Sequence, residues 1–210
     1  MRVKRYRPLQ RRVRLALLMM SLGLSLGLGL TAGRAVAQAP SVQTLQMCAA
    51  CHGERGNSRL PGSPSLAAQP RIFIENQLVM IREGLREVAP MKGLLADMKD
   101  EEFTALAKYF SEQKIQPEAT ALDTSRAARG ATLSKRGQCG SCHLPDYSGR
   151  EQMPRLAGQR EDFLLSSMKE FRDGRATGRD TIMVATLRGM TDAELTDLAH
   201  YFATSRRGTQ

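Results

Sequence analysis

The cysteines of this chain are grouped into two copies of one pentapeptide. Residues 48–52 read Cys-Ala-Ala-Cys-His and residues 139–143 read Cys-Gly-Ser-Cys-His, and together they contain all four cysteines. This spacing serves three chemistries: a redox-active dithiol, half of a zinc site, or covalent attachment of a haem whose iron binds the histidine. The surroundings of the two motifs decide among them.

The motifs belong to an internal repeat with an offset of about 91 residues. Residues 64–69, Pro-Ser-Leu-Ala-Ala-Gln, correspond to residues 154–159, Pro-Arg-Leu-Ala-Gly-Gln. After each of these segments we expect a helix with one apolar face, because apolar residues recur at helical spacing. The first helix has Ile74, Leu78, Ile81 and Leu85, and the second has Leu164, Met168 and Phe171.

A final helix is also expected in each half. Phe103, Leu106 and Phe110 in the first half correspond to Leu195, Leu198 and Phe202 in the second. The second of these helices starts with a capping-box pattern, Thr191 followed by Glu194. No stretch alternates long enough for a strand, so we predict an all-α fold of two tandem domains related by duplication.

The domain boundaries follow from the repeat. The stretch from about residue 111 to 125 lacks apolar periodicity and contains Pro117, which is typical of a connection between domains. We therefore predict one domain at 38–115, a linker at 116–125 and a second domain at 126–210.

This context favours haem over the other two chemistries. The two-residue spacer presents both thiols to one porphyrin edge and places the histidine beneath the ring. A redox dithiol expects a βαβ setting, which is absent, and a shared zinc site would leave the duplicated helices without a common purpose. Domains this small bury little apolar area, and the chain has no Trp. Two covalently bound haem c groups would supply the apolar body that the two halves lack.

The N-terminal segment reads as an export signal. Seven basic residues within 2–14 precede an apolar run at 15–30 and the small-x-small pattern Ala35-Val36-Ala37. We predict a signal peptide at 1–37, cleavage after Ala37 and a periplasmic protein. The alternative is a retained anchor, for which the run is short, because a membrane span takes roughly 20 residues.

The charge of the chain belongs largely to this segment. It has eight basic residues and no acidic one, so the remainder carries only about +2 of the net +10. The basic excess is therefore not a nucleic-acid-binding face, and no nucleic-acid partner is expected.

The second axial ligand of each iron separates electron transfer from ligand chemistry at an open iron. His200 is the one histidine outside the motifs, and we expect it on a solvated helix face. Two methionine pairs occur in both halves. Met98 and Met190 directly precede the final helices, where apolar residues pack as staples. Met91 and Met183 lie in polar, glycine-bearing loops about 40 residues after each motif histidine, which makes them the predicted distal ligands.

The sequence thus predicts two complete haem sites. A ligating histidine normally donates its other ring N–H to a fixed acceptor. The carbonyls of Pro64 and Pro154 could serve, or these prolines could only shape the loop. The haem is expected on Cys48, Cys51, Cys139 and Cys142, with iron bound by His52, Met91, His143 and Met183.

With these residues in place, the chain resembles cytochrome c4. The resemblance is carried by residues 51–58 (Cys-His-Gly-Glu-Arg-Gly-Asn-Ser), 156–159 (Leu-Ala-Gly-Gln), 171–174 (Phe-Arg-Asp-Gly) and the two endings of methionine loop and helix. It implies two class I cytochrome c domains, methionine ligands that map onto Met91 and Met183, haem-edge contact between the domains, and electron delivery to terminal oxidases. The chain departs from the family pattern with Leu-Ala-Ala-Gln at 66–69 and Leu-Pro after the second motif.

The expected function is an electron carrier and not an enzyme. We expect electron transfer from a quinol-oxidising cytochrome complex to a terminal oxidase. The alternative is the electron-accepting subunit of a periplasmic dehydrogenase, such as a flavocytochrome c sulfide dehydrogenase. A di-haem peroxidase would need an open iron, which the methionine pairs argue against. The expected partners are redox proteins, with membrane contact only through them unless the signal segment is retained.

Overall fold

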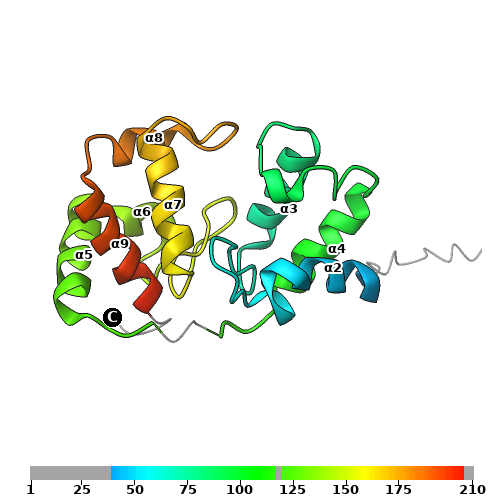
Figure 1. Ribbon diagram of the computed structural model, residues 1–210, viewed down its shortest axis with the longest axis horizontal. Helices are drawn as coiled ribbons and strands as arrows, with labels where there is room; N and C mark the ends of the chain where they lie inside the picture. Colours follow the sequence, from blue (N-terminus) through cyan, green and yellow to red (C-terminus); the bar gives the residue numbers. More distant parts are fainter. Residues whose placement is uncertain (1–38, 117–119, 206–210) are drawn as a thin grey trace, which may run out of the picture. The chain divides into compact units, whose positions relative to one another are not determined.

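The computed structural model describes residues 39–116 and 120–205 (Figure 1). The signal peptide predicted for residues 1–37 and its cleavage site lie outside these ranges. Within them the regular structure is helical, and the β-type pairing is limited to one isolated bridge between Arg150 and Met153. The predicted all-α fold is confirmed. Among the described residues, no helix has the length and apolarity needed to cross a bilayer.

The first half of the repeat is built around a helix pair. Its elements are α2 (Val42–His52), the 3-10 turn η1 (Glu54–Gly56), α3 (Arg71–Arg82), the 3-10 turn η2 (Ala89–Met91) and α4 (Asp100–Ser111). Helix α3 packs against α4. Ile74 of α3 and Leu106, Ala107 and Phe110 of α4 form the buried centre of this half.

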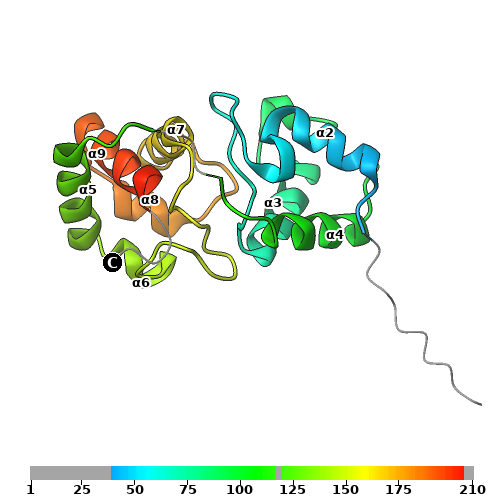
Figure 2. The ribbon, with the colours of Figure 1, turned by 90° about the horizontal axis from the view of Figure 1, so that it is seen from below.

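The second half has the same order of elements, but its first helix and the helix of its motif are separate. Its elements are α5 (Thr124–Arg136), α6 (Cys139–His143), α7 (Glu161–Arg172), α8 (Thr181–Leu187) and α9 (Asp192–Thr204). Helix α9 packs against α5 on one side and α7 on the other, as Figures 1 and 2 show. Its Leu195, Leu198 and Phe202 are almost completely buried in the core of this half.

The apolar helix pattern holds for α3 and α7 except at one position. Ile74, Leu164 and Met168 are buried as expected. Leu85, which the spacing placed on α3, lies beyond its end and is 60% exposed. The helix ends earlier because Gly84 adopts a positive φ of 68°, a conformation that favours glycine and terminates helices.

The starts of the final helices follow the sequence pattern closely. Thr191 Oγ1 accepts a hydrogen bond from the Glu194 backbone N–H, and the Glu194 carboxylate accepts one from the Thr191 N–H, which completes the predicted capping box. Met98 and Met190 pack against the cores of their own halves. Their predicted structural role is therefore confirmed.

His200 does not lie on a solvated face, and that expectation is wrong. The side chain is 1% exposed. Its Nδ1 donates to Glu161 Oε2 at 2.9 Å, and its Nε2 accepts from the Asp123 backbone N–H at 3.0 Å. Both ring nitrogens are thus satisfied, which allows a polar ring to be buried. His200 joins α9 to the start of α7 and to the residue that caps α5.

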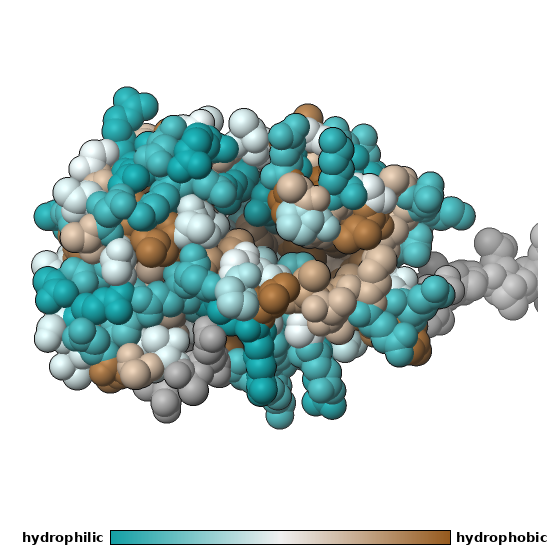
Figure 3. Space-filling view, viewed as in Figure 1, coloured by the Kyte–Doolittle hydropathy of each residue, from teal (hydrophilic) through white to brown (hydrophobic). Residues whose placement is uncertain are grey.

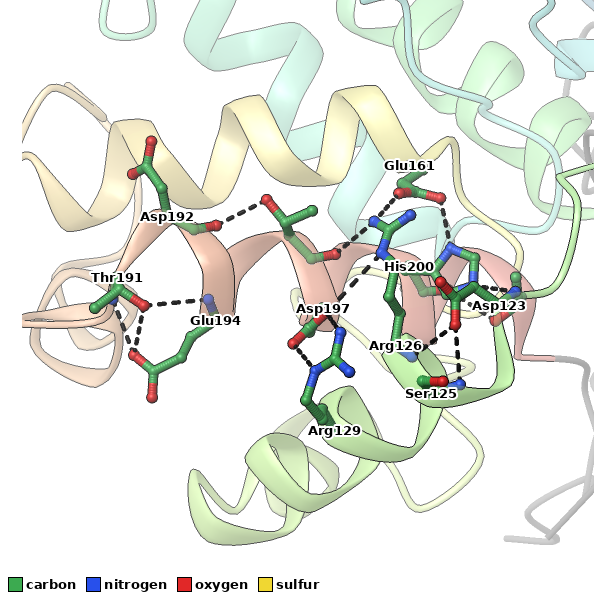
Figure 4. Close-up of polar contacts among 12 residues, drawn as sticks. Asp123, Ser125, Arg126, Arg129, Glu161, Thr191, Asp192, Glu194, Asp197 and His200 are labelled. Carbon is green, nitrogen blue, oxygen red and sulfur yellow. Dashed lines mark hydrogen bonds and ion pairs between the residues drawn. The ribbon is translucent and has the colours of Figure 1, made fainter.

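A second polar group joins α5 to α9. Arg129 of α5 makes two hydrogen bonds to the Asp197 carboxylate, at 2.6 and 2.9 Å, and Arg126 pairs with Glu161 at 2.5 Å (Figure 4). Paired, doubly hydrogen-bonded guanidinium groups hold a fixed geometry better than single ion pairs do. The helix that precedes the second motif is therefore held firmly against α9.

Candidate functional site

Each Cys-x-x-Cys-His motif lies on a short stretch of helix. Cys48 and Cys51 belong to the last turns of α2, and Cys139 and Cys142 to α6. Residues three apart on a helix share one face, so the two thiols of each motif are directed to the same side. None of the four cysteines is paired in a disulfide. Both thiols of a motif can therefore bond to one edge of the same planar group, such as a porphyrin.

The two motif histidines are buried and held in the same way. His52 Nδ1 is 2.9 Å from the Pro64 carbonyl oxygen, and His143 Nδ1 is 2.8 Å from that of Pro154. A carbonyl only accepts, so the ring proton is on Nδ1 and Nε2 carries the lone pair. This is the tautomer in which imidazole binds a metal. The question left open for the two prolines is settled: both carbonyls accept from the motif histidines.

Burial shifts the pKa values of the histidine and of the first cysteine in the same directions in both motifs. Removal from water lowers the pKa of His52 and of His143, so both rings are neutral near pH 7, as a metal ligand must be. Burial also raises the pKa of the Cys48 and Cys139 thiols. Cysteines that exchange disulfides usually have a lowered pKa. The electrostatics of the site therefore disfavour a redox dithiol.

The predicted methionine ligands lie at equivalent positions of the repeat, but in different secondary structure. Met91 is the last residue of η2, after Pro90, and is partly buried. Met183 lies on α8 and packs against the core of the second half. The expectation of a loop at Met183 is wrong, because the Asp180 carboxylate accepts from the Ile182 N–H and caps a short helix there.

An arginine holds the end of each methionine segment. Arg82, the last residue of α3, donates to the carbonyl of Met98 at 3.0 Å and pairs with Asp100 at 2.8 Å. Arg172, at the end of α7, donates to the carbonyl of Met190 at 3.3 Å and also pairs with Asp192. These equivalent contacts tie the segments of Met91 and Met183 to the ends of the preceding helices.

The surroundings of the motifs suit a flat apolar group. Figure 3 shows a hollow bordered by apolar residues on the face of the first half. Around Cys48 the partly buried apolar side chains include Leu45, Leu66, Phe73 and Leu78. Cys139 packs likewise with partly buried apolar residues of the second half. Thiols, a neutral imidazole and an apolar wall are together the donor set that c-type haem requires.

Two buried glutamines lie outside the Cys-x-x-Cys-His motifs. Gln69 and Gln159 are 4% and 3% exposed, and each hydrogen-bonds to backbone in the other half of the repeat. Their residue type alone does not indicate that they are buried, because glutamine is common on protein surfaces. The signal that could have found them is the repeat itself, in which they occupy equivalent positions.

Two family models match the chain, one in each half. The model described as "Cytochrome C oxidase, cbb3-type, subunit III" matches residues 31–110, and the model described as "Cytochrome c" matches residues 127–206. The chain therefore consists of two cytochrome c domains in tandem. Each contains one of the two Cys-x-x-Cys-His motifs.

Relatives match over nearly the whole length. Cytochrome c4 of Pseudomonas aeruginosa is 32% identical over 88% of this chain and 94% of its own. A thiosulfate dehydrogenase electron acceptor of Thiomonas intermedia is 32% identical over 74% of this chain and 77% of its own. The crystal structure of reduced recombinant cytochrome c4 from Pseudomonas stutzeri superposes with a TM-score of 0.72 at 29% identity, over 80% of this chain and all of that one.

The sequence, the fold and the relatives agree. The tandem domains, the two motifs and the length of the matches require two covalently bound haem c groups, one in each half. This chain belongs to the cytochrome c4 family of di-haem electron-transfer proteins.

Proposed function

We propose that each haem is held by four residues of its own half of the chain. The two thiols would attach the haem through thioether bonds, and a histidine and a methionine would bind its iron. In the first half these residues are Cys48, Cys51, His52 and Met91; in the second they are Cys139, Cys142, His143 and Met183.

The observation that carries this proposal is the repeated anchoring of the histidines. In both halves the ring is buried, its Nδ1 proton is engaged by a proline carbonyl, and its Nε2 is left as a metal donor. A histidine fixed in this way keeps its orientation through changes of iron charge. Small reorganisation of the ligands suits electron transfer better than substrate chemistry.

The proposed role is to carry electrons in the periplasm from a quinol-oxidising cytochrome complex to a terminal oxidase. Bound haem supplies an iron that takes up and releases one electron, and methionine ligation raises its potential. The chain contributes the covalent anchor, the fixed imidazole and an apolar wall that keeps water from the iron. With a histidine and a methionine as iron ligands, no site for a substrate would remain at the iron, so the proposed role is that of a carrier and not an enzyme.

Replacing the proposed methionine ligands tests the assignment. Met91→Leu and Met183→Leu keep volume and apolarity but remove the sulfur, at a usual stability cost under about 1.5 kcal/mol. We expect each variant to lose half of the ferric charge-transfer absorption that reports methionine–iron ligation, and the double variant to lose all of it.

The second methionine pair provides the matched control. Met98→Leu and Met190→Leu make the same change in the pair that packs on the cores, and the charge-transfer absorption should remain complete. The ligand assignment is wrong if these controls lose the absorption, or if Met91→Leu and Met183→Leu keep it.

A relative supports a second candidate function. The Thiomonas intermedia protein is described as the electron acceptor of a thiosulfate dehydrogenase. A dehydrogenase partner would use the same haem sites with a different electron donor. Stopped-flow mixing of the oxidised protein with a reduced quinol-oxidising complex, and separately with a thiosulfate dehydrogenase and thiosulfate, separates the two. Faster saturable reduction by the dehydrogenase would overturn the respiratory assignment in favour of this second function.

A further inference from the structure

The two halves of the repeat exchange a symmetric pair of glutamine contacts. Gln159 Oε1 accepts the Ser65 N–H at 2.8 Å, and Gln159 Nε2 donates to the Ser65 carbonyl at 2.9 Å. In the opposite sense, Gln69 Oε1 accepts the Arg155 N–H at 2.9 Å, and Gln69 Nε2 donates to the Arg155 carbonyl at 3.1 Å. Each side-chain amide thus pairs with both backbone groups of one residue in the other half.

These contacts end on the peptide groups that hold the motif histidines. Pro64 and Ser65 share one peptide bond: its carbonyl accepts from His52 Nδ1, and its N–H donates to Gln159. Pro154 and Arg155 share the equivalent bond, whose carbonyl accepts from His143 and whose N–H donates to Gln69. A single planar amide therefore connects each motif histidine to a side chain of the other half.

Hydrogen bonds in series strengthen one another. An amide that donates its N–H to an acceptor gains electron density on its carbonyl oxygen. That oxygen then attracts the histidine Nδ1 proton more strongly and makes the ring a more basic ligand. A more basic axial ligand stabilises the ferric state, which lowers the reduction potential.

Burial makes the arrangement effective. Ser65 is 6% and Arg155 1% exposed, and the glutamines are similarly buried, so water does not compete for the amide groups. At low effective dielectric, a hydrogen bond is electrostatically stronger than in water. The same series of histidine, proline carbonyl, peptide N–H and glutamine occurs twice, once from each half to the other. A chance contact between domains would not produce this symmetry.

We propose that Gln159 and Gln69 are positioning residues that tune the haem of the opposite half through these peptide groups. Gln159 acts on His52 and its haem, and Gln69 acts on His143 and its haem. This inference rests on the proposed function in one respect: His52 and His143 are taken as iron ligands. It gives each half of the molecule an influence on the potential of the other.

The test is a crossed shift of potential in the haem-loaded protein. Gln159→Met and Gln69→Met keep side-chain length and remove the amide. The potential of each haem is followed by NMR-monitored redox titration of its methyl signals. We expect Gln159→Met to raise the potential of the haem on Cys48 and Cys51 more than the other, and Gln69→Met to do the reverse. The histidine Nδ1–H resonance of the same haem should shift in the reduced protein.

A third variant controls for loosening of the contact between halves. Asp162 accepts a hydrogen bond from the Gly62 N–H at 2.8 Å, which crosses between the halves without involving either histidine-bound peptide group. Asp162→Ala removes a charge and can shift both potentials together, but it should produce no crossed difference between the two haems and leave both Nδ1–H resonances unchanged. If Gln159→Met does not fold, Gln159→Asn, whose amide is one methylene shorter, replaces it with the same expected direction.

Several results would overturn the tuning role. They are no shift, equal shifts of both haems, a shift confined to the haem of the substituted half, or the same shift in Asp162→Ala. The wild-type spectrum separates this failure from failure of the proposed function. If wild type lacks histidine–methionine ligation, the proposed function fails; if it has that ligation and the crossed shift is absent, only the tuning role fails.

Discussion

A chain carrying Cys48→Ser and Cys51→Ser is expected to mature with one haem instead of two and to lose the fold of its first half. The pair Cys139→Ser and Cys142→Ser should also leave one haem but retain more helix. The two variants make the same chemical change in equivalent motifs. A difference between them therefore reports how much each half depends on its haem.

The expected asymmetry comes from the size of the two cores. The contiguous core cluster of the first half has four buried residues, Ile74, Leu106, Ala107 and Phe110. The corresponding cluster of the second half has eleven buried residues, including four that are 2% exposed or less on α9. Burial contributes about 25 cal/mol per Å² of apolar area. The smaller cluster therefore leaves the first half with a lower free energy of unfolding when the haem is lost.

Haem content and helix content measure this directly. A pyridine-haemochrome assay gives haem per chain, and far-ultraviolet circular dichroism with temperature gives the helix that remains and its unfolding. Equal loss of helix in the two variants, or a larger loss in the Cys139→Ser, Cys142→Ser variant, would contradict the account of the two cores.

The second large effect is expected at a glycine where α5 crosses α9. A Cβ on Gly130 would lie 2.3 Å from the Asp197 carbonyl oxygen and 2.5 Å from Tyr201 Cβ. The first of these contacts is with backbone, which a rotamer change cannot relieve. Alanine in a helix interior gains about 1 kcal/mol over glycine from propensity. Overpacking of this kind costs about 3 kcal/mol, so we expect Gly130→Ala to destabilise the second half by at least 2 kcal/mol net.

Gly137 at the end of the same helix is the matched control. Its φ is −81°, and an added Cβ would make only ordinary contacts, at 3.4 Å or more. Gly137→Ala should change the free energy of unfolding by less than about 1 kcal/mol. Denaturant unfolding of the haem-loaded variants gives both values. A Gly130→Ala protein as stable as Gly137→Ala would show that the helices do not cross this closely in solution.

Much of the site follows from the sequence because its determinants are local. The Cys-x-x-Cys-His spacing sets the geometry of thiols and imidazole within little more than one helical turn, and the carbonyls of Pro64 and Pro154 lie only twelve and eleven residues further on. The helices before and after them follow from apolar periodicity. Duplication added a second, independent copy of each pattern, which separated repeated features from incidental ones.

The parts that sequence reasoning missed depend on contacts between distant residues. His200 is buried because Glu161 and Asp123, 39 and 77 residues away, satisfy both ring nitrogens. The short helix at Met183 depends on a single cap by Asp180, against a background of polar and glycine residues that indicates a loop. Gln69 and Gln159 act across the halves, and no periodicity reveals a partner 86 or 94 residues away.

We propose that both irons are fully ligated by protein atoms and serve electron transfer alone. The most direct test is exposure of the fully reduced, two-haem protein to carbon monoxide. A separate optical redox titration gives the number of electrons taken up per chain. We expect two one-electron transitions at high potential and an unchanged reduced spectrum under carbon monoxide. Carbon monoxide binding at either iron of the wild-type protein, or uptake of only one electron per chain, would contradict this proposal.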